Sequence, residues 1–126
     1  MSIFSSIMGN AGVVEPEKLR KDFADLLIPS EDIEIGFKLL RDIFIFTTKR
    51  LILIDKQGIT GKKMAYLSIN YKSISRFSIE TAGTFDLDAE LKIWISSESH
   101  PSISRRFNKS VNVYEVQRIL AQNVLK

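Results

Sequence analysis

The sequence predicts a mainly β fold, a sandwich or partly open barrel of about seven short antiparallel strands, with one helix before them and one after them in the chain. Two dense apolar runs flank the polar group at residues 47–50, which indicates a buried hairpin with a tight turn. Apolar and polar residues alternate in several short segments between residues 33 and 107, as such strands require. Helical stripes of apolar residues precede and follow this region, and the second helix can cover an open barrel interior.

The composition excludes several classes of protein and site. The 126 residues, 44% of them hydrophobic, suffice for one domain with a continuous core. There is no cysteine, so disulfides, thiolate metal sites and cysteine nucleophiles are excluded, which fits a reducing cytoplasm. The start of the chain lacks the positive charge and the apolar run of a signal peptide. Charges interrupt every later apolar segment before ~18 residues, the length of a membrane span. We therefore expect a cytoplasmic protein.

Residues 1–14 are predicted to form a flexible apolar tip, because a Gly-rich break follows its apolar start. A helix is expected over residues 15–27, where Pro16 occupies the first helical position beside acidic residues. The apolar stripe of this helix has four members: Leu19, Phe23, Leu26 and Leu27. We expect the stripe to pack on the body of the same protein or on a neighbouring subunit, which makes Leu19 and Phe23 candidate interface residues.

The expected strands lie between the two helices. The first covers residues 33–39, where apolar residues at every second position indicate a half-buried strand. The others follow in order: two strands that flank residues 47–50, then residues 64–69, 74–80, 87–95 and about 103–107. The strand over residues 87–95 has the clearest alternation. Trp94 falls on its polar face, so we expect this aromatic side chain to be exposed.

A second helix is expected over residues 112–125. Asn112 and Glu115 have the spacing of a capping box at its start. Its apolar stripe again has four members: Val113, Val116, Leu120 and Val124. Burial of this stripe would complete the core, so residues 15–126 are predicted to form a single domain that includes both helices.

The net charge of +3 is unevenly distributed along the chain. The four blocks carry −4 over residues 1–35, +7 over residues 36–76, −4 over residues 77–99 and +4 over residues 100–126. A basic middle between acidic flanks suits anionic partners or self-association between unlike faces; ordinary solvated turns are the alternative. Five basic residues from two successive turns form the candidate set for binding an anion or a partner: Lys49, Arg50, Lys56, Lys62 and Lys63.

The spacing of residues indicates no catalytic or cofactor-binding arrangement. Gly58 and Gly61 are too close together for a phosphate-binding P-loop, and a strand rather than a helix follows them. His100 is the single histidine and cannot by itself form a multi-histidine metal site. The acids between residues 86 and 90 fall largely on the polar face of a strand, with a weak cation site as the alternative. We therefore expect no enzyme, no metal and no cofactor.

The expected partners follow from the surroundings of the basic and aromatic residues. Nucleic acid is not expected, because the aromatics near the basic turns, Phe44 and Phe46, belong to apolar runs and are not available for base stacking. Acidic headgroups or an acidic protein suit the basic turns better. Trp94 shares its strand face with Lys92 and Glu90, and an aromatic side chain beside charges of both signs suits a protein interface. The alternative is that the N-terminal helix covers Trp94 in the same chain.

Many short motifs of the chain occur in the same order as in the sequences of one family. They include Leu40-Arg41-Asp42, Phe46-Thr47, Lys49-Arg50-Leu51-Ile52-Leu53, Asp55-Lys56-Gln57-Gly58, Thr60-Gly61-Lys62-Lys63, Tyr71-Lys72-Ser73-Ile74, Glu80-Thr81-Ala82-Gly83 and Glu90-Leu91-Lys92-Ile93-Trp94. From about Leu19 to its end, the chain resembles the small bacterial pleckstrin-homology (PH) domain family. Asn70 departs from the pattern, because the family favours proline at this position before the tyrosine.

The resemblance implies a PH-like, partly open barrel of about seven antiparallel strands capped by the C-terminal helix. It also implies a non-enzymatic cytoplasmic domain of poorly defined role that forms ring-like homo-oligomers. Eukaryotic PH domains often bind phosphoinositides through a basic loop between their first two strands. The corresponding junction here holds only Arg41 with Asp42 beside it, which gives little support to the same lipid specificity.

Two functions are therefore expected as alternatives. The first is an interaction module that self-assembles through edge strands and the N-terminal helix and presents its basic turns to a protein partner. The second is a peripheral module at the inner face of the membrane, whose basic turns meet anionic lipid while an apolar tip inserts. The inserting residues would be Ile3, Phe4, Ile7 and Met8.

Overall fold

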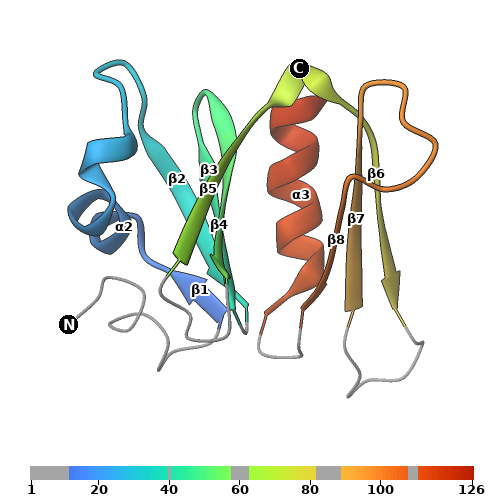
Figure 1. Ribbon diagram of the computed structural model, residues 1–126, viewed down its shortest axis with the longest axis horizontal. Helices are drawn as coiled ribbons and strands as arrows, with labels where there is room; N and C mark the ends of the chain where they lie inside the picture. Colours follow the sequence, from blue (N-terminus) through green and yellow to red (C-terminus); the bar gives the residue numbers. More distant parts are fainter. Residues whose placement is uncertain (1–11, 40, 58–62, 82–88, 108–110) are drawn as a thin grey trace. The chain divides into compact units, whose positions relative to one another are not determined.

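The chain folds into two compact units, each with its own antiparallel sheet and α-helix (Figure 1). The computed structural model describes residues 12–39, 41–57, 63–81, 89–107 and 111–126. Unit 1 is Met1–Ile69 and unit 2 is Asn70–Lys126. The predicted fold class, mainly β with antiparallel strands and a C-terminal helix, is confirmed.

Unit 1 contains a five-stranded antiparallel sheet in the order β1-β2-β3-β4-β5. The strands are β1 (Gly12–Val14), β2 (Ile33–Lys38), β3 (Asp42–Thr47), β4 (Arg50–Gln57) and β5 (Lys63–Asn70). β3 and β4 are the predicted central hairpin. Thr47 shapes its two-residue turn, because its hydroxyl oxygen accepts hydrogen bonds from the backbone N–H groups of Lys49 at 3.1 Å and Arg50 at 2.9 Å.

The first strand, β1, is absent from the sequence prediction, which places residues 12–14 in a flexible tip. In the structure these residues pair with β2, with Val13 opposite Phe37. A strand of three residues is too short to show an alternating pattern, which explains why the prediction misses it. The remainder of the predicted tip, residues 1–11, lies outside the described residues.

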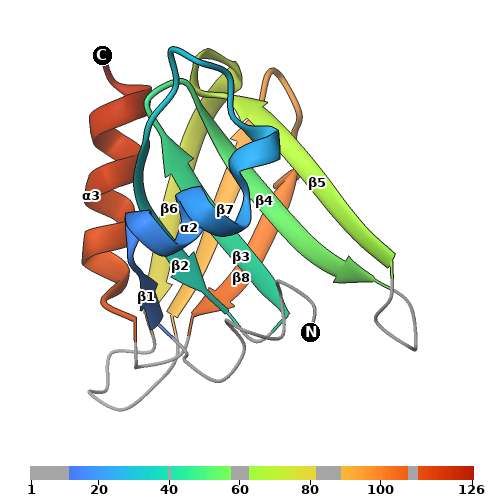
Figure 2. The ribbon, with the colours of Figure 1, turned by 90° about the vertical axis from the view of Figure 1, so that its left-hand side faces the viewer.

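The N-terminal helix is shorter than predicted. α2 covers Pro16–Asp22, and a 3-10 helix follows at Ala24–Leu26. Phe23 lies between them with non-helical backbone angles, φ −124° and ψ 27°. Figure 2 shows α2 lying across one face of the unit 1 sheet. The predicted stripe is retained, because Leu19 and Phe23 are buried there and the next two stripe residues pack partly against them.

Both faces of the unit 1 sheet are buried at its centre, from β2 to β4, which corrects the prediction that residues 33–39 form a half-buried strand. The α2 face is covered by a cluster of eight buried residues: Val14, Leu19, Phe23, Ile33, Ile43, Ile45, Ile52 and Ile54. The opposite face holds Phe37 and Phe46, whose rings meet edge to face with centroids 5.9 Å apart. A bulge between Ile33 and Ile35 breaks the alternation of β2. Ile33 therefore joins the α2 cluster, on the other side from Phe37.

Unit 2 contains a three-stranded antiparallel sheet in the order β6-β7-β8. Its strands are β6 (Ile74–Thr81), β7 (Ala89–Ile95) and β8 (Ile103–Phe107). A 3-10 helix at Tyr71–Ser73 precedes β6, and the Asn70 side chain caps it by accepting a hydrogen bond from the Lys72 N–H at 3.1 Å. The asparagine that departs from the family pattern therefore has a local structural role.

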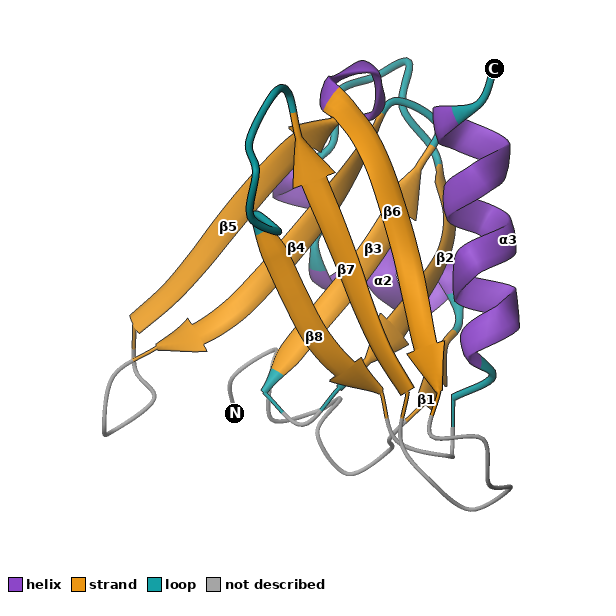
Figure 3. Cartoon of the chain, turned by 90° about the vertical axis from the view of Figure 1, so that its right-hand side faces the viewer, coloured by secondary structure: helices purple, strands orange, loops and turns teal. Residues whose placement is uncertain are grey.

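The C-terminal helix α3 covers Val113–Val124 and lies beside β6 (Figure 3). Asn112 caps it, as the sequence predicts, by accepting a hydrogen bond from the Tyr114 N–H at 3.0 Å. Three of the four stripe residues are buried: Val113, Val116 and Leu120. The last buried position is Asn123 instead of Val124; its amide nitrogen donates to the Ile119 carbonyl oxygen at 3.0 Å. Among the described residues, no helix is long and apolar enough to cross a membrane.

Gly36 permits the close approach of α2 to the sheet, so adding a methyl group there should destabilise unit 1. A Cβ atom at this position would clash with the fully buried Leu19 Cδ1 and would lie 3.4 Å from the Phe44 carbonyl oxygen. We expect Gly36→Ala to lower the free energy of unfolding by about 1–3 kcal/mol through overpacking. Urea unfolding measures the change.

The same clash predicts non-additivity with Leu19→Ala. This substitution removes the clashing atom and leaves space for the added methyl group. The double variant should therefore lose less stability than the sum of the two single losses. Additive losses would contradict the proposed contact.

Candidate interaction surfaces

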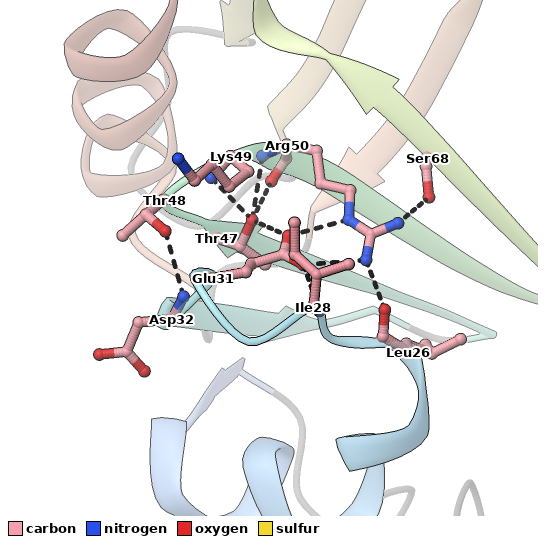
Figure 4. A network of polar contacts seen from close by, with 9 residues as sticks. All are labelled: Leu26, Ile28, Glu31, Asp32, Thr47, Thr48, Lys49, Arg50 and Ser68. Atoms are coloured by element: carbon pink, nitrogen blue, oxygen red, sulfur yellow. Dashed lines mark hydrogen bonds and ion pairs between the residues drawn. The ribbon is translucent and has the colours of Figure 1, made fainter.

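Arg50, one of the predicted partner-binding residues, is engaged within unit 1 (Figure 4). Its guanidinium donates to both carboxylate oxygens of Glu31, from Nε at 2.8 Å and from Nη2 at 2.9 Å. It also donates to the Leu26 carbonyl oxygen at 2.5 Å and to the Ser68 hydroxyl at 2.8 Å. Arg50 therefore connects the segment after α2 to both β4 and β5.

Glu31 is the buried half of this pair, with a side chain that is 0% exposed. The Thr47 hydroxyl donates to it at 2.5 Å and the Ile28 N–H donates at 3.3 Å. Burial acts to raise the pKa of Glu31, but the hydrogen bonds from Arg50, Thr47 and Ile28 together outweigh burial and lower the pKa below its ordinary value. The pair with Glu31 raises the pKa of Arg50. The sequence analysis did not identify Glu31, because nothing in the sequence pairs two residues so far apart.

The other basic candidates lie at two opposite ends of β4. Lys49 is exposed in the β3–β4 turn, whereas Lys56 lies near the far end of β4. A rise of ~3.3 Å per residue separates them by about 23 Å along the strand. Lys63 begins β5 and lies with Lys56 at the end where β4 passes into β5. Lys62 lies outside the described residues. The structure therefore brings Lys56 and Lys63 to one end and leaves Lys49 at the other.

Two further basic residues lie at the Lys56 end of unit 1. The Lys56 N–H donates to the Arg41 carbonyl oxygen at 3.3 Å, which places Arg41 next to it. Lys38 is buried, and its ammonium donates to the Leu39 carbonyl oxygen. Burial lowers the pKa of Lys38, the Asp42 charge opposes this shift, and the Lys56 charge adds to it. We call Lys38, Arg41, Lys56 and Lys63 the basic end of unit 1.

The predicted interface residues of the N-terminal helix are covered by their own chain. Leu19 is fully buried and Phe23 is 4% exposed, and both belong to the α2 cluster. Of the two surfaces that the sequence analysis offers for this stripe, the structure places it on the body of the same protein.

Trp94 lies on the outer face of the unit 2 sheet but is partly buried, which corrects the prediction of an exposed side chain. Leu91 and Ile93 of β7 are buried, so Lys92 and Trp94 project to the opposite side. Arg76 of β6 is paired with Trp94 in the register, and its guanidinium carbon lies 4.6 Å from the centroid of the indole ring. The sequence analysis did not identify Arg76, because the strand register decides which residue faces Trp94.

Lys92 forms ion pairs with two acidic residues on the same face, Glu80 and Glu90. Glu80 and Glu90 are directly paired across β6 and β7, where like charges repel. The Lys92 ammonium lies 3.0 Å from both carboxylate oxygens of Glu80 and 3.8 Å from the Glu90 carboxylate. The hydrogen bond to Glu80 raises the pKa of Lys92. Ser104 of β8 also donates to Glu90, at 2.9 Å. The carboxylates of this face are therefore already paired.

The described residues contain no group of three or more His, Cys, Asp or Glu side chains placed to hold a metal ion. The described polar and aromatic groups instead form surfaces: the basic end of unit 1 and the outer face of unit 2. Both kinds of surface suit binding to another molecule.

Comparison with known proteins agrees with this architecture. A family model described as the bacterial PH domain matches residues 2–124. The chain belongs to the bacterial PH-domain family. The resemblance stated from the sequence motifs is therefore confirmed, over nearly the whole chain.

Relatives and solved structures are similar over most of their lengths. The chain is 51% identical over 121 residues to the uncharacterized protein YjqA of Bacillus subtilis (strain 168), which covers 96% of this chain and 97% of YjqA. A DUF1696 family protein with a PH domain from Shewanella loihica PV-4 is 43% identical, with a TM-score of 0.80 and coverage of 91% and 97%. A PH domain from Shewanella amazonensis SB2B is 46% identical, with a TM-score of 0.80 and coverage of 97% and 98%. These structures confirm the PH-like fold and indicate no enzyme family.

Protonation of Glu31 should destabilise the protein as the pH falls. Because the folded pKa is below the ordinary value of 4.5, the pair contributes stability above about pH 4.5 and loses it as the pH falls through the folded pKa. We expect Glu31→Gln to lower the free energy of unfolding at pH 7 by about 1–3 kcal/mol, since charge-assisted hydrogen bonds are lost. Urea unfolding between pH 7 and pH 3 measures both effects.

Asp32→Asn is the matched control for this experiment. Asp32 pairs with Arg20 on the surface at 2.8 Å, where an ion pair contributes little to stability. The control should keep most of the pH dependence of the natural protein, whereas Glu31→Gln should reduce it. An unchanged pH dependence in Glu31→Gln would contradict the role given to Glu31.

Proposed function

We propose that this chain is a non-enzymatic PH-like interaction module that assembles into a homo-oligomer, with β5, an edge strand of the described unit 1 sheet, as its contact. The observation that carries the proposal is the exposure of β5, the last strand in the order of the unit 1 sheet. Tyr66 and Leu67 are 49% and 48% exposed, and Ser68 after them is exposed as well. Since successive side chains point to opposite faces of a strand, the middle of β5 is accessible from both sides.

An exposed edge strand offers backbone N–H and C=O groups to another strand. Tyr66 and Leu67 would add apolar contacts to these hydrogen bonds, and aromatic residues are frequent anchors of interfaces. Within the described sheet, β1 is the opposite edge and also carries an exposed apolar residue, Val13, at 46%. Pairing β5 of one copy with β5 of another would give a dimer, whereas pairing unlike edges would give a ring or a filament.

The composition supports a binding role over catalysis. The chain contains one histidine and no cysteine, so two of the side chains that most often act as general base or nucleophile are scarce or missing. The PH-domain family to which the chain belongs supports the same conclusion.

Substitution of Tyr66 tests the β5 contact. We expect the natural protein to have a native mass of at least twice the 14.4 kDa chain. Tyr66→Lys should shift it toward the monomer, because a charge on an edge strand opposes strand pairing. Light scattering after size-exclusion chromatography measures the mass across a range of protein concentrations.

Tyr114→Lys is the matched control, because Tyr114 is 61% exposed and belongs to α3, not to β5. The control should keep the native mass. A monomeric natural protein, or equal loss of mass in both variants, would contradict the proposed contact.

A peripheral membrane module is the second candidate, and the basic end of unit 1 favours it. Arg41, Lys56 and Lys63 lie at the same end of the sheet, so their charges could act together on an anionic lipid surface. Lys49, at the other end of β4, would contribute less to the same contact.

Vesicle sedimentation separates the two candidates. If the second holds, the protein should sediment with anionic and not with neutral vesicles, and added salt should weaken the binding. The double variant Lys56→Glu and Lys63→Glu should lose this binding, whereas Lys49→Glu should retain most of it. No sedimentation with anionic vesicles at low salt would leave only the interaction module.

A further inference from the structure

The outer face of the unit 2 sheet presents a cation stacked on an aromatic ring. β7 places Trp94 on this face, and the strand register brings Arg76 of β6 opposite it. The Ser75 hydroxyl donates to the Trp94 carbonyl oxygen at 3.2 Å, which fixes the same pair of strands at this point. The stacked pair therefore lies on two paired strands, directly after a register shift in β6 between Ile74 and Arg76.

Arg76 retains capacity to bind a ligand in this arrangement. Its guanidinium lies over the indole ring and its side chain is exposed. Among the described residues, no carboxylate or carbonyl oxygen accepts a hydrogen bond from the Arg76 side chain, and no ion pair involves it. Stacking uses the flat face of a guanidinium and leaves its N–H groups in the plane, where they can bind both oxygens of a carboxylate.

The carboxylates of Glu80 and Glu90 do not compete with a ligand for Arg76, because they are paired with Lys92. Lys92 pairs with Glu80 and Glu90, and Ser104 donates to Glu90. Arg76 and Arg106 are therefore the cations of this face without an ion pair among the described residues, and of the two it is Arg76 that lies over the indole ring.

We propose that Arg76 and Trp94 form a docking site for an acidic segment of a partner protein. A glutamate or aspartate side chain of the partner would place its carboxylate in the plane of the Arg76 guanidinium and its methylene groups against the indole. Charge complementarity supports an anion, and the adjoining ring supports one that carries an apolar stem. Glu80 and Glu90 on the same face oppose a dense anionic surface such as a membrane, which favours a protein segment with isolated carboxylates.

A second observation supports a ligand with acceptor atoms. Trp94 Nε1 is buried and has no hydrogen-bond partner among the described residues. A buried donor without an acceptor is unfavourable, because it has lost its bonds to water. A partner oxygen that reached Nε1 would satisfy this donor and add to the affinity.

Trp94 is the single tryptophan of the chain, so its fluorescence reports directly on the site. The experiment titrates the full chain with a hexaglutamate peptide and, as the matched neutral probe, with hexaglutamine. We expect a saturable change of Trp94 emission with hexaglutamate, weakened by salt, and at least roughly tenfold weaker binding of hexaglutamine. Equal effects of the two peptides, or no change with hexaglutamate, would overturn the proposal.

Two variants test the residue assignment. Arg76→Gln should weaken hexaglutamate binding by roughly tenfold or more, because the charge-assisted contact is lost. Arg106→Gln removes the same charge from an exposed position on β8, opposite Glu90, and should change binding by less than about twofold. Equal losses in the two variants would show a diffuse charge effect and would overturn the site. Thermal unfolding by circular dichroism identifies a variant that fails to fold, in which case Arg76→Lys replaces Arg76→Gln.

The same experiment can show that another molecule binds at Arg76 and Trp94, and either of two such results would overturn the proposal. A change of Trp94 emission on dilution of the protein alone, lost in Arg76→Gln, would show that a second copy occupies the face. Anionic vesicles that change the emission when hexaglutamate does not would show a lipid surface. The proposal is independent of the β5 contact: Arg76→Gln leaves β5 unaltered, so its native mass tests self-assembly separately.

Discussion

The pair of Arg50 with the buried carboxylate of Glu31 is the interaction on which the arrangement of unit 1 depends. A buried carboxylate is tolerated only when its charge is compensated by close and well-directed donors, and Glu31 receives them from a guanidinium, a hydroxyl and a backbone N–H. Arg50 also binds Leu26 and Ser68, so one side chain connects the end of the N-terminal helical segment, the central hairpin and β5. A residue that looks in the sequence like part of a basic binding loop is in fact a structural connection.

The second constraint is the close contact between α2 and the sheet at Gly36. The side chain of Leu19 occupies the space that a Cβ atom at Gly36 would need, so the helix lies directly against the strand. This contact covers the second face of β2 at Gly36. This packing buries the apolar stripe of α2, so the stripe is not available to bind another molecule. The strand edges and the polar faces of the sheets are the surfaces left for binding.

The β5 edge and the outer face of the unit 2 sheet differ in the chemistry they offer. The β5 edge offers backbone groups with flanking apolar side chains, which suits another strand and has little preference for charge. The outer face of β6, β7 and β8 offers side chains in a fixed register, with one guanidinium stacked on one indole. A small PH-like domain with both could assemble with itself through an edge and bind a second molecule through a face.

The sequence by itself determined the local elements and the family. Alternation and turn residues located the central hairpin, a proline and an asparagine marked the starts of the two helices, and the order of short motifs identified the PH-like fold. Only the tertiary structure decided that Arg50 pairs with Glu31, that residues 12–14 form a strand, and that Arg76 lies over Trp94. The physical reason is that periodicity specifies which residues share a face of an element, whereas strand register and the packing of a second layer specify which residues from distant segments meet there.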